Sequence, residues 1–208
     1  MTFSLILRDP ETGEFGSAIS SSSPAVAARC VNLAEGVGGA HPQNATDPRL
    51  GPKLLDRLRA GATAQEALDA VVAEADPATI DYRQLLVLDG AGRAAVFSGG
   101  RALGVFGDTR RENAVAGGNM LASLAVLDAL VDTALSASGG IEERLYAALR
   151  AAVAAGGEEG PVHSAGISVV GSAGWRVTDL RVDWADDPIE ALGRALDVWL
   201  PQRDDYVS

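Results

Sequence analysis

Thr2 is the residue of this chain whose type and position best suit covalent catalysis. If Met1 is removed, Thr2 carries a free α-amine next to its own hydroxyl. An α-amine has a pKa near ~8 and can accept the hydroxyl proton, which activates the oxygen as a nucleophile toward a carbonyl carbon. Many chains begin Met-Thr without any such role, so the dipeptide alone leaves both interpretations open.

A second candidate is the segment Gly117-Gly118-Asn119, which we place where a strand runs into a helix beginning near Met120. Glycines at such a junction expose backbone N–H groups, and the Asn119 amide can donate to a developing oxyanion. The plainer interpretation is that Asn119 caps the helix.

The segment that follows a predicted helix over 142–155 carries Glu158, Glu159 and, further on, Ser164. An acid and a serine in one loop could both serve a catalytic centre. Paired glutamates in a loop are, however, usually solvated. Solvation is therefore the competing interpretation for Glu158 and Glu159.

The two histidines invite other mechanisms that the local sequence disfavours. His163, Ser164 and Asp183 suggest a Ser-His-Asp triad, but adjacent strand residues point to opposite faces, which places His163 badly for activating Ser164. His163 and His41, the latter next to Pro42 in a predicted loop, are more simply residues of a turn or rim.

Standard nucleotide, esterase and metalloprotease motifs are absent, since no P-loop, G-x-S-x-G or H-E-x-x-H occurs. With two histidines and one cysteine, Cys30, a zinc site has almost no ligands to draw on. Cys30 lies among alanines and valines and is typical of a small buried apolar residue. We expect no metal and no other cofactor.

The composition of the chain limits the classes of partner that it can bind. The chain has 208 residues, 47% hydrophobic and 22% charged, and its net charge of -11 disfavours nucleic acid and anionic membrane surfaces. No apolar stretch approaches the ~20 residues of a membrane helix, and residues 1–4 do not resemble the start of a signal peptide. We expect a single cytoplasmic domain over 1–208 that binds a small molecule.

The elements expected around Thr2 explain why its position matters. Apolar and polar residues alternate over 3–8, turn residues follow over 9–13, and a return strand covers 15–21. Antiparallel pairing then brings Thr2 opposite Ser20 or Ser21. A serine run, Ser20 to Ser23, would lie beside the nucleophile.

The remaining elements predict the fold class. Helices are expected over 52–61, 63–75, 120–137, 142–155 and 187–200. Strands are expected over 84–88, 93–97, 113–116, 164–170 and 175–182, and a strand or strand pair over 31–40. Hairpin strands with two separate helix pairs favour an α+β fold in which helices cover both outer faces of two stacked sheets. We therefore expect a four-layer αββα sandwich.

Several segments together resemble the DUF1028 family from end to end. They are Met-Thr-Phe-Ser at 1–4, Asp-Pro-Glu-Thr-Gly at 9–13, Gly-Gly-Asn-Met-Leu at 117–121, the segment 156–164, and Asp-Leu-Arg-Val-Asp at 179–183. That family in turn resembles the N-terminal-nucleophile (Ntn) hydrolases, which share an αββα sandwich with proteasome β subunits. The fold implied by the resemblance agrees with the layering inferred from the elements.

The resemblance implies an Ntn-like site around Thr2. Thr2 matches the nucleophile, Gly118 and Asn119 fall near it, and Glu158 and Ser164 match only by position. The lysine of proteasome-type sites has no match, because the single lysine, Lys53, lies at a helix start.

The leading hypothesis is an Ntn-type amidohydrolase that acts on a small amide or amino-acid derivative. Its catalytic residues would be Thr2, Asn119, Ser164 and Glu158, and its substrate-binding residues Ser20, Ser21, Ser22, Gln43, Asn44, Gly118 and His163. Two alternatives stay open: a non-catalytic binding protein of the same fold that retains Met1, and an oligomeric scaffold. Homo-oligomerisation is compatible with all three.

Overall fold

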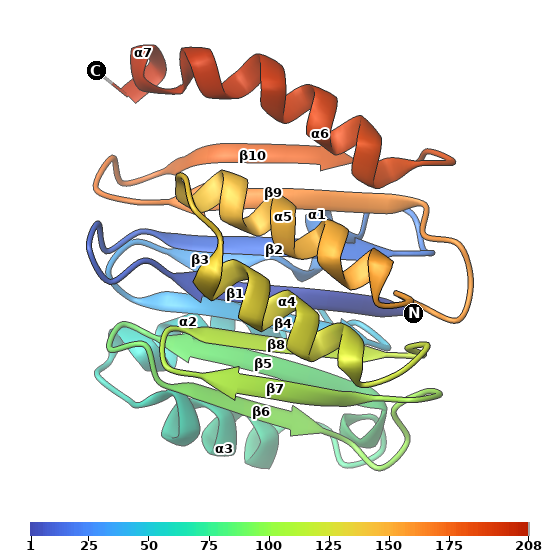
Figure 1. Ribbon diagram of the computed structural model, residues 1–208. Helices are drawn as coiled ribbons and strands as arrows, with labels where there is room; N and C mark the ends of the chain where they lie inside the picture. Colours follow the sequence, from blue (N-terminus) through green and yellow to red (C-terminus); the bar gives the residue numbers. More distant parts are fainter. Residues whose placement is uncertain (208) are drawn as a thin grey trace.

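The computed structural model describes residues 1–207 and consists of two antiparallel sheets stacked face to face (Figure 1). The larger sheet has six strands. In spatial order they are β10 (Arg176–Val182), β9 (Ser164–Val170), β2 (Phe15–Ser21), β1 (Thr2–Arg8), β8 (Ala114–Asn119) and β7 (Gly107–Arg111). The strand that begins at Thr2 therefore lies in the middle of this sheet.

The smaller sheet has four strands and packs against β1, β2 and β8. In spatial order they are β3 (Asn32–Ala34), β4 (Gly38–Asn44), β5 (Arg83–Asp89) and β6 (Ala94–Ser98). Ile6 and Val115 from the larger sheet meet Leu86 and Leu88 from the smaller one in the apolar part of the interface.

Helices cover the outer face of each sheet, as Figure 1 shows. Those on the larger sheet are α4 (Ala125–Ser136), α5 (Ile141–Ala154) and α6 (Pro188–Trp199), and those on the smaller sheet are α2 (Leu50–Arg59) and α3 (Ala64–Glu74). Short helices complete the chain: α1 (Val26–Cys30), η1 (Ile80–Tyr82), η2 (Leu200–Gln202) and α7 (Arg203–Val207). The predicted α+β fold with four αββα layers is confirmed. Within residues 1–207, no helix has the length and apolar character that crossing a membrane requires.

Alternation along β1 decides which way Thr2 faces. Phe3, Leu5 and Leu7 pack with residues of α4 and α5 in the core between sheet and helices. Ile6 points the other way, into the interface between the two sheets. Successive strand residues face opposite sides, so Thr2 and Ser4 share the inner face with Ile6. The candidate nucleophile thus lies at the end of a buried strand, between the sheets.

The strand or strand pair expected over 31–40 is a pair, β3 and β4. Its expected end is wrong, because β4 continues through His41 and Pro42, so neither residue lies in a loop. The helix expected from Met120 begins only at Ala125, because residues 120 and 121 donate backbone hydrogen bonds to the carbonyls of residues 103 and 105. Asn119 ends β8 and caps no helix.

Candidate active site

Four buried polar residues meet at one end of the larger sheet, on its inner face. Thr2 pairs with Asn119 of β8, and Ser21 of β2 pairs with Ser164 of β9. The register of β1 with β2 places Phe3 opposite Ser20, so the next position outward puts Thr2 beside Ser21, one of the two serines that the turn predicted. Antiparallel pairing therefore brings residues 2, 21, 119 and 164 together from four strands.

Two hydroxyl groups of this cluster converge on one carbonyl oxygen. Thr2 Oγ1 donates to the Met1 carbonyl oxygen over 2.5 Å, and Ser21 Oγ donates to the same oxygen. The two hydroxyl oxygens lie 3.4 Å apart. The end of β1 thus holds a carbonyl group between two hydroxyl donors.

Ser164 is close to this pair, but its hydroxyl serves the backbone. Ser164 Oγ donates to the Ser23 carbonyl over 2.6 Å and accepts from the Val26 amide over 3.3 Å. These bonds fix the turn that leads from β2 into α1. Ser20 points to the opposite face from Ser21 and donates to the Ser164 carbonyl over 3.0 Å. The strand alternation thus separates Ser20 from the cluster.

Glu158 is buried, although its neighbour Glu159 is exposed, so the solvated interpretation is wrong for Glu158. The reason is a backbone bridge between Leu121 and Glu158, which holds this loop against the sheet end. Glu158 is 5% exposed, its Oε2 accepts from the Ser22 amide over 3.2 Å, and its Oε1 has no partner. Burial raises the pKa of the Glu158 carboxyl to about 7, against smaller lowering effects of the N-terminal amine, Ser22 and His163.

This shift predicts a pH-dependent stability difference for Glu158→Gln. The folded-state pKa lies above the ordinary value of 4.5, so folded protein binds more protons than unfolded protein between about pH 4.5 and 7. The contribution of Glu158 to the free energy of unfolding is therefore fully present below about pH 4.5 and is lost as the pH rises to about 7. We expect Glu158→Gln to gain up to about 3 kcal/mol relative to wild type between pH 4.5 and 8.

Urea unfolding of both proteins across this pH range measures the effect, with Glu159→Gln as a control of equal charge change at an exposed position. A stability difference between Glu158→Gln and wild type that does not change with pH would contradict the assigned burial effect.

A chain of buried polar side chains runs from Asn119 into the space between the sheets. Gln84 of β5 donates through Nε2 to the Gly107 and Gly118 carbonyls over 3.2 and 3.1 Å. Its Oε1 must therefore be the acceptor for Gln43 Nε2 at 2.7 Å and Asn119 Nδ2 at 3.4 Å. Asn119 Oδ1 is left buried without a partner. The amide of Asn119 is thus oriented by Gln84.

The same chain continues through Ser4 to His41. Ser4 Oγ donates to Gln43 Oε1 over 2.6 Å, so it must accept from His41 Nδ1, which lies 3.0 Å away. His41 Nε2 then accepts from Ser17 Oγ over 2.8 Å. Burial, aided by the charge of Arg176, lowers the pKa of His41 to about 3, and the ring is neutral. The interpretation of His41 as a turn or rim residue is wrong.

The other proposed binding residues lie around this centre. Position 118 has no room for a side chain, because a Cβ on Gly118 would lie 2.7 Å from the Leu121 side chain and 3.0 Å from the Thr2 carbonyl oxygen. Asn44 ends β4 and donates to the Tyr82 carbonyl over 2.7 Å. The backbone of His163 donates to Ser21, while its ring stacks on Trp184 with centroids 4.4 Å apart. Gly118 thus belongs to the cluster, whereas the side chains of Asn44 and His163 turn to other partners.

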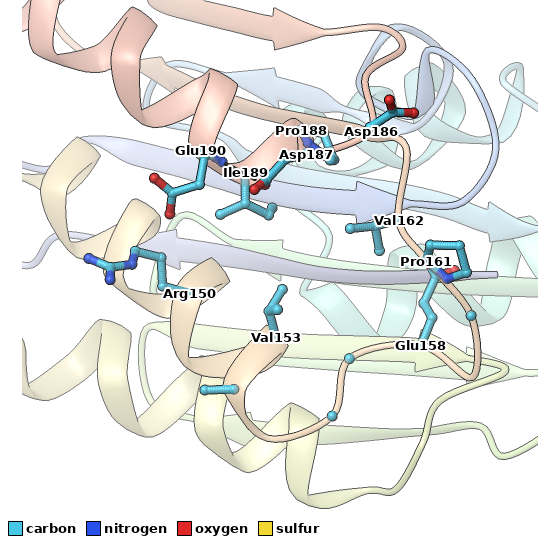
Figure 2. Close-up of a pocket in the computed structure, with 14 residues that line it drawn as sticks. Arg150, Val153, Glu158, Pro161, Val162, Asp186, Asp187, Pro188, Ile189 and Glu190 are labelled. Atoms are coloured by element: carbon cyan, nitrogen blue, oxygen red, sulfur yellow. Dashed lines mark hydrogen bonds between the residues drawn. The ribbon is translucent and has the colours of Figure 1, made fainter.

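A cavity of about 460 Å³ adjoins Glu158, between the end of α5, the following loop and the start of α6 (Figure 2). Val153, Val162 and Ile189 give it apolar walls, with Glu158 near one end and Arg150 near the other. Acidic side chains outnumber basic ones among its lining residues; these acids are Glu158, Asp186, Asp187 and Glu190. In the described part of the chain, no three His, Cys, Asp or Glu side chains gather as metal ligands.

Comparison with known proteins agrees with this architecture. A family model described as "Family of unknown function (DUF1028)" matches residues 2–192. The chain belongs to the DUF1028 family. Protein SPO2555 from Silicibacter pomeroyi, whose crystal structure carries the same family model, is 32% identical to this DUF1028 protein. The TM-score is 0.88, and the match covers 95% of this chain and 88% of that one.

A more distant likeness concerns Anbu (ancestral beta-subunit) from Yersinia bercovieri. Its identity to this DUF1028 protein is 12% and its TM-score 0.43, over 96% of this chain and 97% of that one. No curated protein matches the chain.

Proposed function

We propose that this DUF1028 protein is an Ntn-type amidohydrolase that cleaves an amide bond of a small metabolite or amino-acid derivative. The observation that carries the proposal is the carbonyl oxygen held between Thr2 Oγ1 and Ser21 Oγ at the buried end of β1. A hydrolase that acylates Thr2 needs a substrate carbonyl in this place. The Met1 carbonyl, which occupies it here, stands in for the carbonyl of an acyl group.

The proposed reaction requires that Thr2 is the first residue. Thr2 Oγ1 attacks the substrate carbonyl carbon and its proton passes to the Thr2 α-amine. The amide C–N bond then breaks, the leaving amine takes that proton, and the acyl group stays on Thr2 as an ester. Water hydrolyses the ester, which releases the acid and restores the Thr2 hydroxyl.

Ser21 is the donor best placed to stabilise the oxyanion in this scheme. Its hydroxyl already donates to a carbonyl oxygen beside Thr2, and the Ser23 amide donates to Ser21 Oγ over 3.1 Å, which orients it. Asn119 contributes through Nδ2, one hydrogen of which Gln84 engages. Removing one oxyanion donor lowers kcat by about 10²–10³-fold in acyl-transfer enzymes. We expect Ser21→Ala to lower kcat in that range, measured on the Met1-free protein with any amide that it hydrolyses; an unchanged kcat would contradict this role.

A non-catalytic binding protein that retains Met1 is the alternative favoured by a specific observation. In this structure the Thr2 hydroxyl is engaged by the Met1 carbonyl, and the Thr2 nitrogen is part of a peptide bond. Such a protein would use the cavity beside Glu158 without any acyl transfer. It would bind ligands equally well with Thr2 replaced.

A comparison of two forms of the chain tests the proposal. One form begins at Thr2, after complete removal of Met1 verified by intact mass, and the other retains Met1. We expect the form that begins at Thr2 to hydrolyse members of a panel of small amides and the Met1 form to be inactive. Equal rates for the two forms, or no hydrolysis by either, would contradict the proposal and favour the binding protein.

A further inference from the structure

Met1 fills the place that an acyl group would take in the proposed reaction. Its carbonyl oxygen is held by the Thr2 and Ser21 hydroxyls, and its carbonyl carbon is bonded to the nitrogen of the same residue whose oxygen would attack. Thr2 N and Oγ1 belong to the same residue and are three covalent bonds apart, so an acyl group on Oγ1 would lie next to the position that Met1 occupies. The other groups of Met1 therefore indicate what surrounds the acyl part of a substrate.

The α-amino group of Met1 acts on Glu158 through its charge, without a hydrogen bond between the two groups. The positive charge of this amine favours the Glu158 carboxylate, against the strong opposing effect of burial. Glu158 Oε1 is buried and has no hydrogen-bond partner, while Oε2 is held by the Ser22 amide. A buried acceptor without a donor costs free energy, which a ligand N–H group would recover. Glu158 is thus preorganised to receive an ammonium group.

The side chain of Met1 runs toward Gly160. Its Cε lies 3.9 Å from the position that a Cβ on Gly160 would occupy. Gly160 and Glu158 both also line the cavity between α5 and α6. Space for an unbranched apolar side chain therefore exists next to the carboxylate, and Val162 and Pro161 continue the lining from there (Figure 2).

From the held carbonyl, the unpartnered Glu158 oxygen and the course of the Met1 side chain we infer that the acyl part of the substrate is an α-amino acid with a free ammonium group and an unbranched apolar side chain, bound through Glu158. This inference rests on the proposed function, because it treats the position of Met1 as the acyl site. The class of substrate is then an amino-acid amide with a free amino group. Amides that lack the ammonium leave the buried Glu158 without its donor.

Matched amides test the inference on the protein that begins at Thr2. L-Norleucine 4-nitroanilide and hexanoic acid 4-nitroanilide have the same carbon chain, but only the first carries the ammonium. We expect kcat/KM to be at least about tenfold higher for the norleucine compound, as for a charge-assisted hydrogen bond. Glu158→Gln should bring the ratio near one, whereas Glu159→Gln, the same change at an exposed position, should leave it unchanged. A ratio near one in the wild type would overturn the inference whatever the variants do.

A binding measurement separates this inference from the proposed function. Thr2→Ala protein freed of Met1 is titrated calorimetrically with L-norleucinamide and with hexanamide, which requires no turnover. Preferential binding of norleucinamide, lost in a Glu158→Gln background, would support the ammonium subsite even if the wild type hydrolysed no amide. Hydrolysis without ammonium preference would overturn the subsite and leave the proposed function standing. Equal or absent binding of the two amides would overturn the inference.

Discussion

Thr2→Ala, in protein freed of Met1, is expected to lower kcat/KM for amide hydrolysis by at least about 10³-fold, because it removes the attacking oxygen. Among the described residues the side chain of Thr2 bonds only to the Met1 carbonyl, which this protein lacks, and to Ser21. Its loss therefore leaves the sheet register intact. We expect the free energy of unfolding to change by less than about 1 kcal/mol. Steady-state kinetics and urea unfolding of the same preparation measure both effects.

Thr2→Ser is the matched control for this experiment. Serine supplies the same hydroxyl beside the same α-amine, so activity should persist within about tenfold of the wild type. Retained activity in Thr2→Ala would remove Thr2 from the mechanism. Loss of activity in both variants with folding unchanged would show that the threonine methyl group, and not only the hydroxyl, is required.

His41→Gln is expected to make the protein much less sensitive to acid. Burial lowers the pKa of His41 to about 3, below its ordinary value of 6.5, so unfolded protein binds more protons than folded protein between these values. Stability attributable to this histidine is present above about pH 6.5 and lost as pH falls through the window. The full loss approaches about 4–5 kcal/mol at the acid end.

Unfolding by urea at a series of pH values from 7 down to 4 tests this prediction. Glu158 contributes with the opposite sign, since its pKa is raised, so the quantity to compare is the difference between variant and wild type at each pH. The glutamine side chain keeps an amide donor and an acceptor for the Ser4 and Ser17 hydroxyls. His163→Gln, the same change at the half-buried ring stacked on Trp184, is the control. Parallel pH profiles for His41→Gln and wild type would contradict the neutral buried histidine.

Much of the fold follows from local patterns in the sequence. Alternation over residues 3–8 predicted β1, and the turn at 9–13 predicted Thr2 opposite Ser20 or Ser21, of which the register selects Ser21. Thr63 and Glu66, three residues apart, form a capping box at the start of the helix expected over 63–75, which is α3. These features are local, because a strand, a tight turn and a helix cap each depend on a few neighbouring residues.

Elements whose structure depends on distant partners were not predictable in this way. β7 carries charged residues at Arg110 and Arg111 and lacks apolar alternation, because it is an edge strand with an exposed side. β4 extends through Pro42 because it pairs with β5, which lies about forty residues later in the chain. The delayed start of α4 depends on backbone bonds from Met120 to the loop before β7.

The candidate site also combines features that local sequence predicts with features that depend on distant partners. The proximity of Thr2 to the serine run follows from one hairpin. The Asn119–Gln84–Gln43 chain does not, since it joins the two sheets and requires their stacking. The sequence does carry a partial signal for this chain: Ser4 and Gln84 are polar residues within predicted strands, and Gln43 lies just after another. The burial of Glu158 depends on the bridge to Leu121, which no local pattern indicates.

Covalent capture at Thr2 tests the central claim most directly. A β-lactone acylates a nucleophilic hydroxyl by opening its ring, so the whole lactone mass is added and no group leaves. The protein that begins at Thr2 is incubated with a small aliphatic β-lactone, and the adduct is located by peptide mass spectrometry, with Thr2→Ala and Met1-retaining protein alongside. The account predicts one adduct, on Thr2, that is absent from both controls. An adduct on another residue, or none on Thr2, would contradict it.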